Sequence, residues 1–542
     1  MQKEKIIFVS NEILIDEIPA YAGGLGILSG GIFSSARDIN YPMIGVTFVY
    51  RKGYVKHKIE NNEIKFLPDE YNPEEYFRKI NKKFFIELKN LRIWFTVWEY
   101  KLSDEVKILF IDSNVPENPE PLRKLTDRLY IESSEEEKIL KRLLLGLGTL
   151  ELVEALGIKP KKFHLNESHC AFLAIELFKK LKNIDLLRKK LVFTTHTVLP
   201  HGHEKFDYAL VERYYEIPKE IKILSPFMLN MSKILFNLAG FVNCVSWKHK
   251  EVMKSFGNEV FSNLEKIEVI TNGVHTKWVA EPLRALYDKY IPGWFKNPEK
   301  FVYAGNINIK ELAEAKQKAK KELISLINAE GYVNKDFNEN YITLVLRRRI
   351  TGYKRNDILF KDIEKIERLS KKYKLQVIVS GVCHPYDKEG KRILEYLKDV
   401  MSVLYYTKLA LLLRNGKKYE RACVSGGDLF IHTPIPPYEA CGTSWMRAGI
   451  NALPTLATRD GGVVECIIDN YNGWLFGKNR INVNEAYEDL YEFYLKLEKI
   501  LELITQKNKE YLRICINALK TIGSLFNTHR MLKEYISKAY ER

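Results

Sequence analysis

Short apolar runs alternate with amphipathic helical patterns along this chain of 542 residues, and the alternation occurs in two successive halves. In the first half the pattern predicts a helix at Glu135–Leu156 and strands at Lys5–Ser10, Met43–Tyr50, Lys107–Asp112, Lys162–Leu165 and Leu191–Thr195. In the second half it predicts strands at Tyr341–Leu346, Gln376–Ser380, Leu429–His432 and Pro454–Thr458. Alternation of this kind favours an α/β fold with parallel sheets. The chain is also too long for one hydrophobic core.

The two halves predict two doubly wound domains. We expect an N-terminal domain over residues 1–285 and a C-terminal domain over 286–525, which carries the phosphate or cofactor site. A region rich in Pro, Gly and Trp, from Trp278 to Trp294, is interpreted as the linker. Residues 526–542 are predicted to form a C-terminal helix that packs back across the domains. In open parallel sheets, ligands bind at the carboxyl ends of the strands.

The net charge of +16 indicates an anionic partner, but Lys, Arg, Asp and Glu are interspersed along the chain and form no basic tail. No nucleic-acid-binding motif is present, so we expect anionic small molecules. The seven cysteines form no C-x-x-C pair, which argues against a disulfide framework and a structural metal site. Without a signal peptide or a membrane span, a cytoplasmic protein is expected. Abundant Lys, Glu and Ile with few Met are compatible with a thermophile.

A cationic cluster, Arg347-Arg348-Arg349-Ile350-Thr351-Gly352-Tyr353-Lys354-Arg355, follows a predicted strand. Arginine offers phosphate a planar fork and lysine a point charge. Arg349 and Lys354 are therefore candidates for gripping one phosphate from two sides. The alternative is a solvated, charged turn. Because like charges so close together repel each other, a counter-anion is expected.

A second segment, Tyr438-Glu439-Ala440-Cys441-Gly442-Thr443-Ser444-Trp445-Met446-Arg447, combines a carboxylate, a Gly-Thr turn and a predicted helix start. A carboxylate can accept hydrogen bonds from sugar hydroxyls, and N–H groups at a helix start can face negative charge. Taken alone, Glu439 fits the role of a helix-cap acid equally well.

Weaker signals follow the early strands. The glycines of Ala22-Gly23-Gly24-Leu25-Gly26 either cradle a phosphate or form a tight loop. His196 lies at the end of a buried strand, where histidine is suited to acid–base chemistry. In His164-Leu165-Asn166-Glu167-Ser168-His169, ordinary capping explains Asn166 and Ser168 as well as ligand contact does. No metal-binding spacing is present.

Taken together and in this order, the segments resemble the α-glucan (glycogen, starch or maltodextrin) phosphorylases over residues 1 to about 480. The likeness is carried by the segments Tyr21–Gly30, Pro42–Tyr54, His164–Ala171, Phe193–Pro200, Asn230-Met231, Asn243–Ser246, Ile270–Val274, Arg347–Arg355, His384–Asp387 and Glu439–Met446. The resemblance implies two Rossmann-like domains facing a cleft, which is the GT-B glycosyltransferase architecture. It also implies phosphorolysis of α-1,4-glucan to α-glucose 1-phosphate with retention, in a compact member of the family.

The resemblance implies a role for each matching residue. Arg349 and Lys354 would grip the substrate phosphate, and Arg348 would face the phosphate of a pyridoxal phosphate cofactor. Gly442 and Thr443 would also bind that cofactor phosphate. The remaining residues would contact phosphate or sugar: Gly24, Leu25, His196, Asn272 and Glu439. The resemblance further implies that the partners of this chain are an α-1,4-glucan or maltodextrin and inorganic phosphate. A homodimer is possible for such a family.

This chain departs from the family pattern at the cofactor. Arg447 stands where phosphorylases carry the lysine that forms the Schiff base with pyridoxal phosphate. A guanidinium is always protonated and is no amine nucleophile, so covalent attachment there should fail. Non-covalent binding that involves Arg447, or loss of the cofactor, remains open. Further departures from the family pattern are Cys441, Trp445, Val382 and Ala452.

Three functions are therefore compatible with the sequence. The first is an α-glucan phosphorylase. The second is a retaining glucosyltransferase that uses a nucleotide-sugar and no pyridoxal phosphate, although enzymes of that kind often place a second Glu at the position of Arg447. The third is a non-catalytic protein that binds glucan or phosphate.

Overall fold

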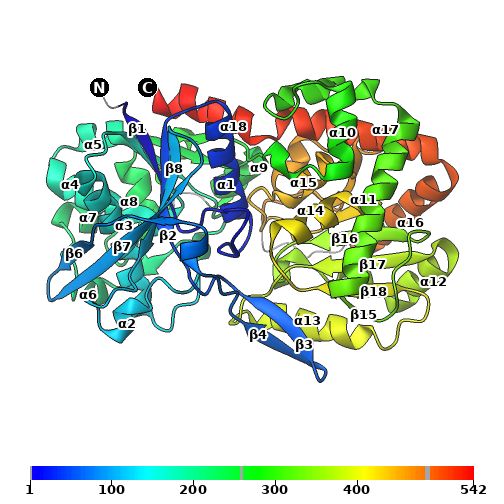
Figure 1. Ribbon diagram of the computed structural model, residues 1–542, viewed down its shortest axis with the longest axis horizontal. Coiled ribbons are helices and arrows are strands. Elements are labelled where there is room, and N and C mark those ends of the chain that lie inside the picture. The colour runs from blue at the N-terminus through cyan, green and yellow to red at the C-terminus, as the bar shows by residue number, and fades with distance from the viewer. Residues whose placement is uncertain (1–2, 257–259, 483–488) are drawn as a thin grey trace. The chain divides into compact units, whose positions relative to one another are not determined.

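The computed structural model describes residues 3–256, 260–482 and 489–542. The chain forms two compact units (Figure 1). Unit 1 consists of Met1–Tyr54, Asp69–Thr271 and Met531–Arg542, and unit 2 of Val55–Pro68 and Asn272–Arg530. Residues 272–285, which the sequence assigned to the first domain, thus lie in unit 2. Among the described residues, no helix is long and apolar enough to cross a membrane.

Unit 1 is built on one large sheet with a parallel core in the order β14-β13-β10-β9-β1-β2-β8. Its parallel strands are β1 (Lys5–Ser10), β2 (Met43–Phe48), β8 (Val106–Asp112), β9 (Pro160–Asn166), β10 (Leu191–Thr194), β13 (Phe241–Cys244) and β14 (Ile267–Val269). Antiparallel strands extend the edge beyond β8: β5 (Arg78–Lys79), β6 (Phe84–Leu88) and β7 (Leu91–Lys101). Chain order reverses between β1 and β9, the switch point at which doubly wound sheets bind ligands.

Helices cover the unit 1 sheet, and α1 (Gly24–Asp38) packs against β2 and β8. The other helices of unit 1 are α2 (Glu120–Arg123), α3 (Glu135–Ala155), α4 (Ala171–Leu181), α5 (Ile184–Lys190), α6 (Tyr208–Val211), α7 (Lys219–Leu224), α8 (Met231–Leu238) and α9 (Trp247–Ser255). The short pair β11 (Lys205–Phe206) and β12 (Leu229–Asn230) lies apart from the sheet. The helix predicted over Glu135–Leu156 is confirmed as α3, which ends one residue earlier, at Ala155.

Unit 2 has a seven-stranded sheet in the order β15-β18-β17-β16-β19-β20-β21. Its strands are β15 (Tyr332–Val333, antiparallel), β16 (Ile342–Arg347), β17 (Leu375–Ser380), β18 (Lys408–Leu412), β19 (Leu429–His432), β20 (Thr455–Thr458) and β21 (Gly473–Phe476). The parallel strands follow the Rossmann order, with the switch point between β16 and β19. The prediction of an α/β fold with two Rossmann-like halves is confirmed.

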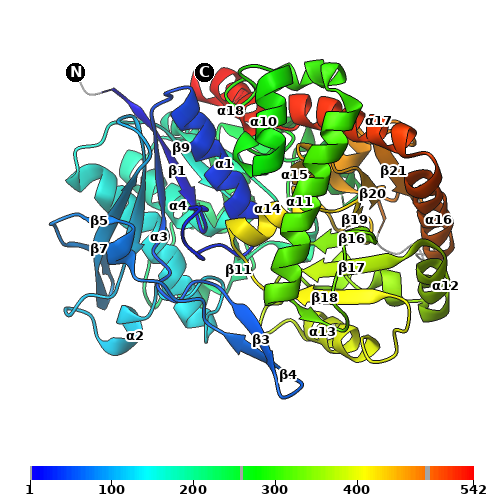
Figure 2. The same cartoon turned by 45° about the vertical axis from the view of Figure 1, so that its right-hand side comes forward.

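Helices lie on both faces of this sheet, with α11 (Ile309–Glu330) crossing the strands in Figure 2 and α12 (Ile363–Tyr373) packed on β17. The others are α10 (Glu281–Tyr290), α13 (Lys388–Val400), α14 (Lys417–Ser425), α15 (Ser444–Gly449), α16 (Leu490–Gln506) and α17 (Asn508–Ala518). The linker predicted from Trp278 to Trp294 is wrong, because this segment contains α10 and both tryptophans are buried. Pro282 occupies the first turn of α10, where proline starts a helix rather than breaking one.

Two segments join the unit that is distant from them in sequence. The hairpin of β3 (Lys56–Glu60) and β4 (Glu63–Leu67) belongs to unit 2, where the His57 ring accepts a hydrogen bond of 2.8 Å from the Cys383 N–H. Helix α18 (Thr528–Tyr535) leads the chain end into unit 1. There the Tyr540 hydroxyl lies 2.6 Å from Nδ1 of His164 on β9. The C-terminal residues thus complete the core of unit 1.

Candidate active site

The switch point of unit 2 brings both chemistry-bearing segments of the sequence together. Arg348 and Arg349 follow directly after β16, and Lys354 lies in the short turn beyond them. Glu439 follows the neighbouring strand β19. Because parallel strands end at one edge of the sheet, residues 85 and 91 positions apart in sequence become neighbours.

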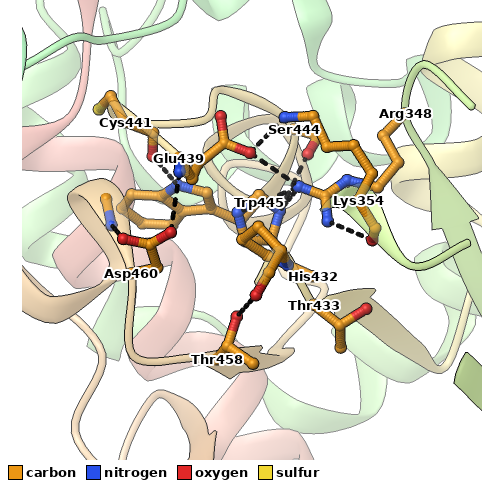
Figure 3. Close-up of polar contacts among 12 residues, drawn as sticks. Arg348, Lys354, His432, Thr433, Glu439, Cys441, Ser444, Trp445, Thr458 and Asp460 are labelled. Carbon is orange, nitrogen blue, oxygen red and sulfur yellow. Dashed lines mark hydrogen bonds and ion pairs between the residues drawn. The ribbon is translucent and has the colours of Figure 1, made fainter. Parts of the chain in front are cut away.

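A buried carboxylate anchors this cluster, as Figure 3 shows. Glu439 accepts hydrogen bonds from Lys354 Nζ and, at 3.2 Å, from Nη2 of Arg348. The counter-anion expected for the cationic cluster is thus supplied by the chain itself. Burial alone would raise the pKa of Glu439, but Lys354 and Arg348 lower it below its usual value. Glu439 is therefore ionised at neutral pH.

Arg349 differs from its neighbours because its side chain is exposed, whereas Arg347 and Arg348 are buried. Its charge still acts on the same carboxylate and contributes to lowering the pKa of Glu439. Lys354 retains 12% of its side-chain exposure. The cluster therefore presents partly accessible positive charge backed by a fully buried arginine, which suits an anionic ligand.

The segment after Glu439 is held in a fixed shape. The backbone N–H of Glu439 donates to Asp460 at 2.8 Å, and Gly442 adopts a φ of +71°. A Cβ at Gly442 would lie only 2.8 Å from Cε1 of His432, so only glycine fits this turn. His432 itself accepts a hydrogen bond of 3.0 Å from Nη2 of Arg348. Burial, Arg348 and Lys354 lower its pKa well below the usual value, so the ring is neutral.

Arg447 lies in a second buried ionic cluster of unit 2. Its Nη1 donates to Glu420 on α14, whose other oxygen accepts a hydrogen bond of 2.7 Å from Arg347. The guanidinium of Arg447 stands 5.4 Å from the ring centroid of the buried Trp278. Thr443, the second of the paired turn residues, accepts hydrogen bonds from Arg447 through its backbone carbonyl.

Asn272 opens unit 2 and is buried. Its backbone is hydrogen-bonded with the Cys441 thiol, close to Glu439 in sequence. Among the described residues its side-chain Oδ1 has no hydrogen-bond partner. A buried amide oxygen without a partner is uncommon, and it is suited to accepting a hydrogen bond from a ligand hydroxyl.

In unit 1 the glycine loop follows β1 and opens α1. Gly24 is exposed and Leu25 half-buried at the first positions of this helix. The buried Glu12 shapes the loop, because its carboxylate accepts a hydrogen bond of 2.6 Å from the Ala22 N–H. The loop leads directly into the first turn of a fifteen-residue helix, and its role as a phosphate cradle stays a prediction.

His196 lies at the other side of the unit 1 switch point and is held from two directions. Its backbone N–H donates to Glu167 at 2.7 Å, and its Nε2 lies 2.9 Å from Oδ1 of Asn166. Burial and the neighbouring His249 and His169 lower its pKa to about 3. The ring is therefore neutral at physiological pH, and its Nε2 is already engaged by Asn166.

Four residues of these clusters were not singled out as functional by the sequence: Glu167, Glu420, His432 and Asp460. Glu167 adopts a φ of +76°, an unusual conformation for a residue other than glycine, and its carboxylate contacts His196 and Thr197. Strained backbone of this kind is typical of functional sites. Glu420 carries no local signal at all, because its role depends on arginines 73 and 27 positions away.

Comparison with known proteins assigns the family. The family model "Carbohydrate phosphorylase" matches residues 215–537, which is more than half of the chain. The chain belongs to the carbohydrate phosphorylase family. A second family model, "Starch synthase catalytic domain", matches residues 5–266.

The carbohydrate phosphorylase relatives include enzymes from heat-adapted organisms. A maltodextrin phosphorylase of Thermococcus litoralis is 30% identical, with the match covering 100% of this chain and 71% of the relative. A glycogen phosphorylase of Aquifex aeolicus is 29% identical over 100% of this chain and 86% of its own length. An uncharacterized protein of Methanocaldococcus jannaschii is 28% identical over 97% of both chains. The resemblance expected over residues 1 to about 480 is confirmed, and the matches extend over the whole chain.

The side chains of this chain do not fit the pyridoxal phosphate that the resemblance implies. Arg447 offers no amine, and its guanidinium is paired with Glu420. The His432 ring lies so close to Gly442 that a Cβ added to this glycine would be only 2.8 Å from Cε1 of the ring. Trp445 is fully buried beside the same turn.

Proposed function

We propose that this chain is an α-glucan phosphorylase-type hexosyltransferase that exchanges the terminal glucosyl unit of an α-1,4-glucan with inorganic phosphate, with retention. The convergence of Lys354, Arg348 and Glu439 at the switch point of unit 2 carries this proposal. It combines cations for a phosphate with a buried carboxylate for sugar hydroxyls. Family membership and full-length similarity to glycogen and maltodextrin phosphorylases support it.

In the proposed reaction, Arg349 and Lys354 hold inorganic phosphate. The phosphate gives its proton to the glycosidic oxygen, the bond from that oxygen to C1 breaks, and a phosphate oxygen forms the new bond to C1 on the same face. Glu439 and Asn272 hold the sugar hydroxyls, for which the unpartnered Oδ1 of Asn272 is suited. His196 contributes hydrogen bonds from a neutral ring, consistent with its low pKa of about 3. Gly24 and Leu25 contribute exposed backbone at the start of α1.

The test is release of glucose 1-phosphate from maltoheptaose or glycogen with inorganic phosphate. Lys354→Met removes one charge from the phosphate clamp, and Lys372→Met is its control, because Lys372 is 59% exposed and pairs with Glu498 on the surface. Loss of such a preorganised charge lowers turnover by about 10²- to 10³-fold. Absence of glucose 1-phosphate with every glucan tried, or equal activity of the two variants, refutes the proposal.

A second function follows from the starch synthase match over residues 5–266. A glucosyltransferase that uses a nucleotide-sugar would place a diphosphate, rather than inorganic phosphate, on the cations of unit 2. Incorporation of labelled glucose from UDP-glucose or ADP-glucose into a glucan, without any phosphate-dependent release, identifies this function. Tight glucan binding without turnover from either donor identifies a non-catalytic binding protein.

The cysteines, the cellular location and the oligomeric state concern the environment of the protein. All seven cysteines lie in the described part of the chain, and six of them are buried. A cytoplasmic location and a homodimer stay predictions, which fractionation of cells and light scattering of the purified protein check.

A further inference from the structure

The positions that the family resemblance assigns to the cofactor are all engaged by other parts of unit 2. Arg348 contacts His432 and Glu439, and Gly442 lies against the His432 ring. Arg447 is paired with Glu420, and the Thr443 carbonyl accepts from Arg447. A site prepared for a ligand usually leaves polar groups turned toward the space the ligand will fill. Here most of these groups already have a partner within the chain, although Nε of Arg348 has none among the described residues.

The imidazole of His432 fills the space between Arg348 and the glycine turn. Its Nδ1 lies 3.0 Å from Nη2 of Arg348 and 3.3 Å from Oγ of Ser444, while its Cε1 abuts Gly442. The ring is 0% exposed, and Figure 3 shows it between Arg348 and Ser444. A phosphate group that contacted both Arg348 and the Gly442 turn would have to occupy the same volume. Because protein interiors are close-packed, the two cannot be present together.

At the position of the Schiff-base lysine, a buried ion pair and a bulky side chain leave no room for a cofactor. Glu420 uses one carboxylate oxygen for Arg447 and the other for Arg347, and Arg347 is held further by Ser380 Oγ at 2.7 Å. Trp445 is 0% exposed, with its ring centroid 5.1 Å from that of Phe526. Moving Arg447 aside to admit a pyridine ring would leave a buried carboxylate with half of its partners, and unpaired buried charge is strongly unfavourable.

We propose that side chains of this chain occupy the cofactor pocket, so that the protein does not bind pyridoxal phosphate, and that His432 positions Arg348 in place of the cofactor phosphate. This proposal rests on the proposed function only for the assignment of the pocket. With the pocket occupied, any anion bound in unit 2 is a substrate, and Lys354 and Arg349 hold it. His432 is a positioning residue in this arrangement, because it contacts Arg348 rather than the reacting atoms.

The decisive measurement is binding of pyridoxine 5′-phosphate to the full-length protein by equilibrium dialysis in phosphate-free buffer. This probe has the ring and phosphate of the cofactor but no aldehyde, so it forms no Schiff base with surface lysines. Methyl phosphate, which has the same phosphate and no ring, is the matched probe. The expected result is equal affinity for the two, with both displaced by inorganic phosphate. Affinity at least tenfold higher for pyridoxine 5′-phosphate overturns the proposal.

Pyridoxal phosphate itself gives a second, independent readout. Protein produced with excess pyridoxine is reduced with borohydride, digested and mapped by mass spectrometry. Adducts spread at low occupancy over surface lysines, or no adducts, agree with a closed pocket. One cofactor per chain at a single position, or one cofactor per chain released on denaturation without reduction, contradicts it.

Activity separates failure of this proposal from failure of the proposed function. Glucose 1-phosphate release that is the same with and without added pyridoxal phosphate supports both. No release together with no preference for pyridoxine 5′-phosphate over methyl phosphate supports the closed pocket and refutes phosphorolysis. Release that requires the cofactor overturns the closed pocket and supports phosphorolysis.

Discussion

The Arg347–Glu420–Arg447 cluster allows a sharp test, because it contains one buried carboxylate and two buried guanidinium groups. The three side chains are 1%, 6% and 4% exposed, respectively. Glu420→Gln removes the only negative charge and leaves two adjacent buried cations. Breaking a buried ion pair in this way costs about 3–5 kcal/mol in the free energy of unfolding. At roughly 2–4 °C per kcal/mol for a domain of this size, the melting temperature should fall by about 6–20 °C.

Removing an arginine should be less harmful than removing the glutamate. In Arg447→Met, Glu420 keeps Arg347 at 2.7 Å, and the cluster becomes neutral. The loss is then that of one charge-assisted hydrogen bond, about 1.5–3 kcal/mol. The exposed pair of Arg392 and Glu389 gives the matched controls, Arg392→Met and Glu389→Gln, because its side chains are 75% and 59% exposed. These controls should change stability by at most about 1 kcal/mol.

The assay is calorimetric and fluorescence-detected unfolding of all four variants, with the transition of unit 2 followed separately where two transitions are resolved. The reasoning is refuted if Glu420→Gln is no more destabilising than Glu389→Gln. It is equally refuted if Arg447→Met is more harmful than Glu420→Gln, since that order requires a role for Arg447 other than pairing with the glutamate.

The same cluster predicts a pH dependence. Burial alone would raise the pKa of Glu420, but Arg347 and Arg447 together lower it below its usual value. A lowered folded-state pKa stabilises the protein fully above the unfolded-state pKa, which is about 4.3 for Glu. This stabilisation disappears as the pH falls through the folded-state pKa. The stability gap between the wild type and Glu420→Gln should therefore be constant from neutral pH down to about 5 and shrink below about 4.3.

Three further predictions concern the candidate active site. Lys354→Met should raise the KM for phosphate and lower kcat/KM by about 10²-fold or more, measured as glucose 1-phosphate release; an unchanged phosphate KM would contradict the clamp. His432→Ala should weaken phosphate-induced thermal stabilisation, because Arg348 loses one of its acceptors, and His432→Asn, which keeps an acceptor, should restore part of it. Glu167→Gln should lower kcat by about 10- to 100-fold with little change in melting temperature, because it misplaces the backbone of His196; a change confined to stability would make Glu167 structural.

Local sequence patterns were sufficient to predict the elements that depend mainly on residues close together in the sequence. The strands at Lys5–Ser10 and Leu429–His432 agree with the structure to the residue, because a buried parallel strand is a continuous apolar run with polar ends. The hairpin Val55–Pro68 was beyond such reasoning. Its exposed, alternating strands resemble any surface hairpin, and its membership of unit 2 depends on contacts such as that of His57 with Cys383, more than three hundred residues away.

The residues of the candidate site also divide into those that the sequence indicated and those that it did not. The cationic cluster and Glu439 were recognisable because glycine turns and charge runs at strand ends are local signals. His432 and Glu420 were not, since a strand-end histidine and a helical glutamate are ordinary in sequence. Their importance arises from pairing with Arg348, Arg347 and Arg447 across the sheet edge. The sequence therefore predicted that the cofactor position was altered, and only the structure identifies which side chains take its place.

The charge of the two clusters bears on what unit 2 can bind. The five cations Arg347, Arg348, Arg349, Lys354 and Arg447 face the three carboxylates Glu420, Glu439 and Asp460, which leaves a formal charge of two positive. A phosphate group carries about −1.5 to −2 near neutral pH. If the pocket held the phosphate of a cofactor as well as that of a substrate, this excess would not neutralise both. The surplus matches a single phosphate, and Lys354 and Arg349 are the cations with accessible surface from which to hold it. The charge count thus favours one bound anion that is a substrate, which is the arrangement expected of a transferase that works without the cofactor.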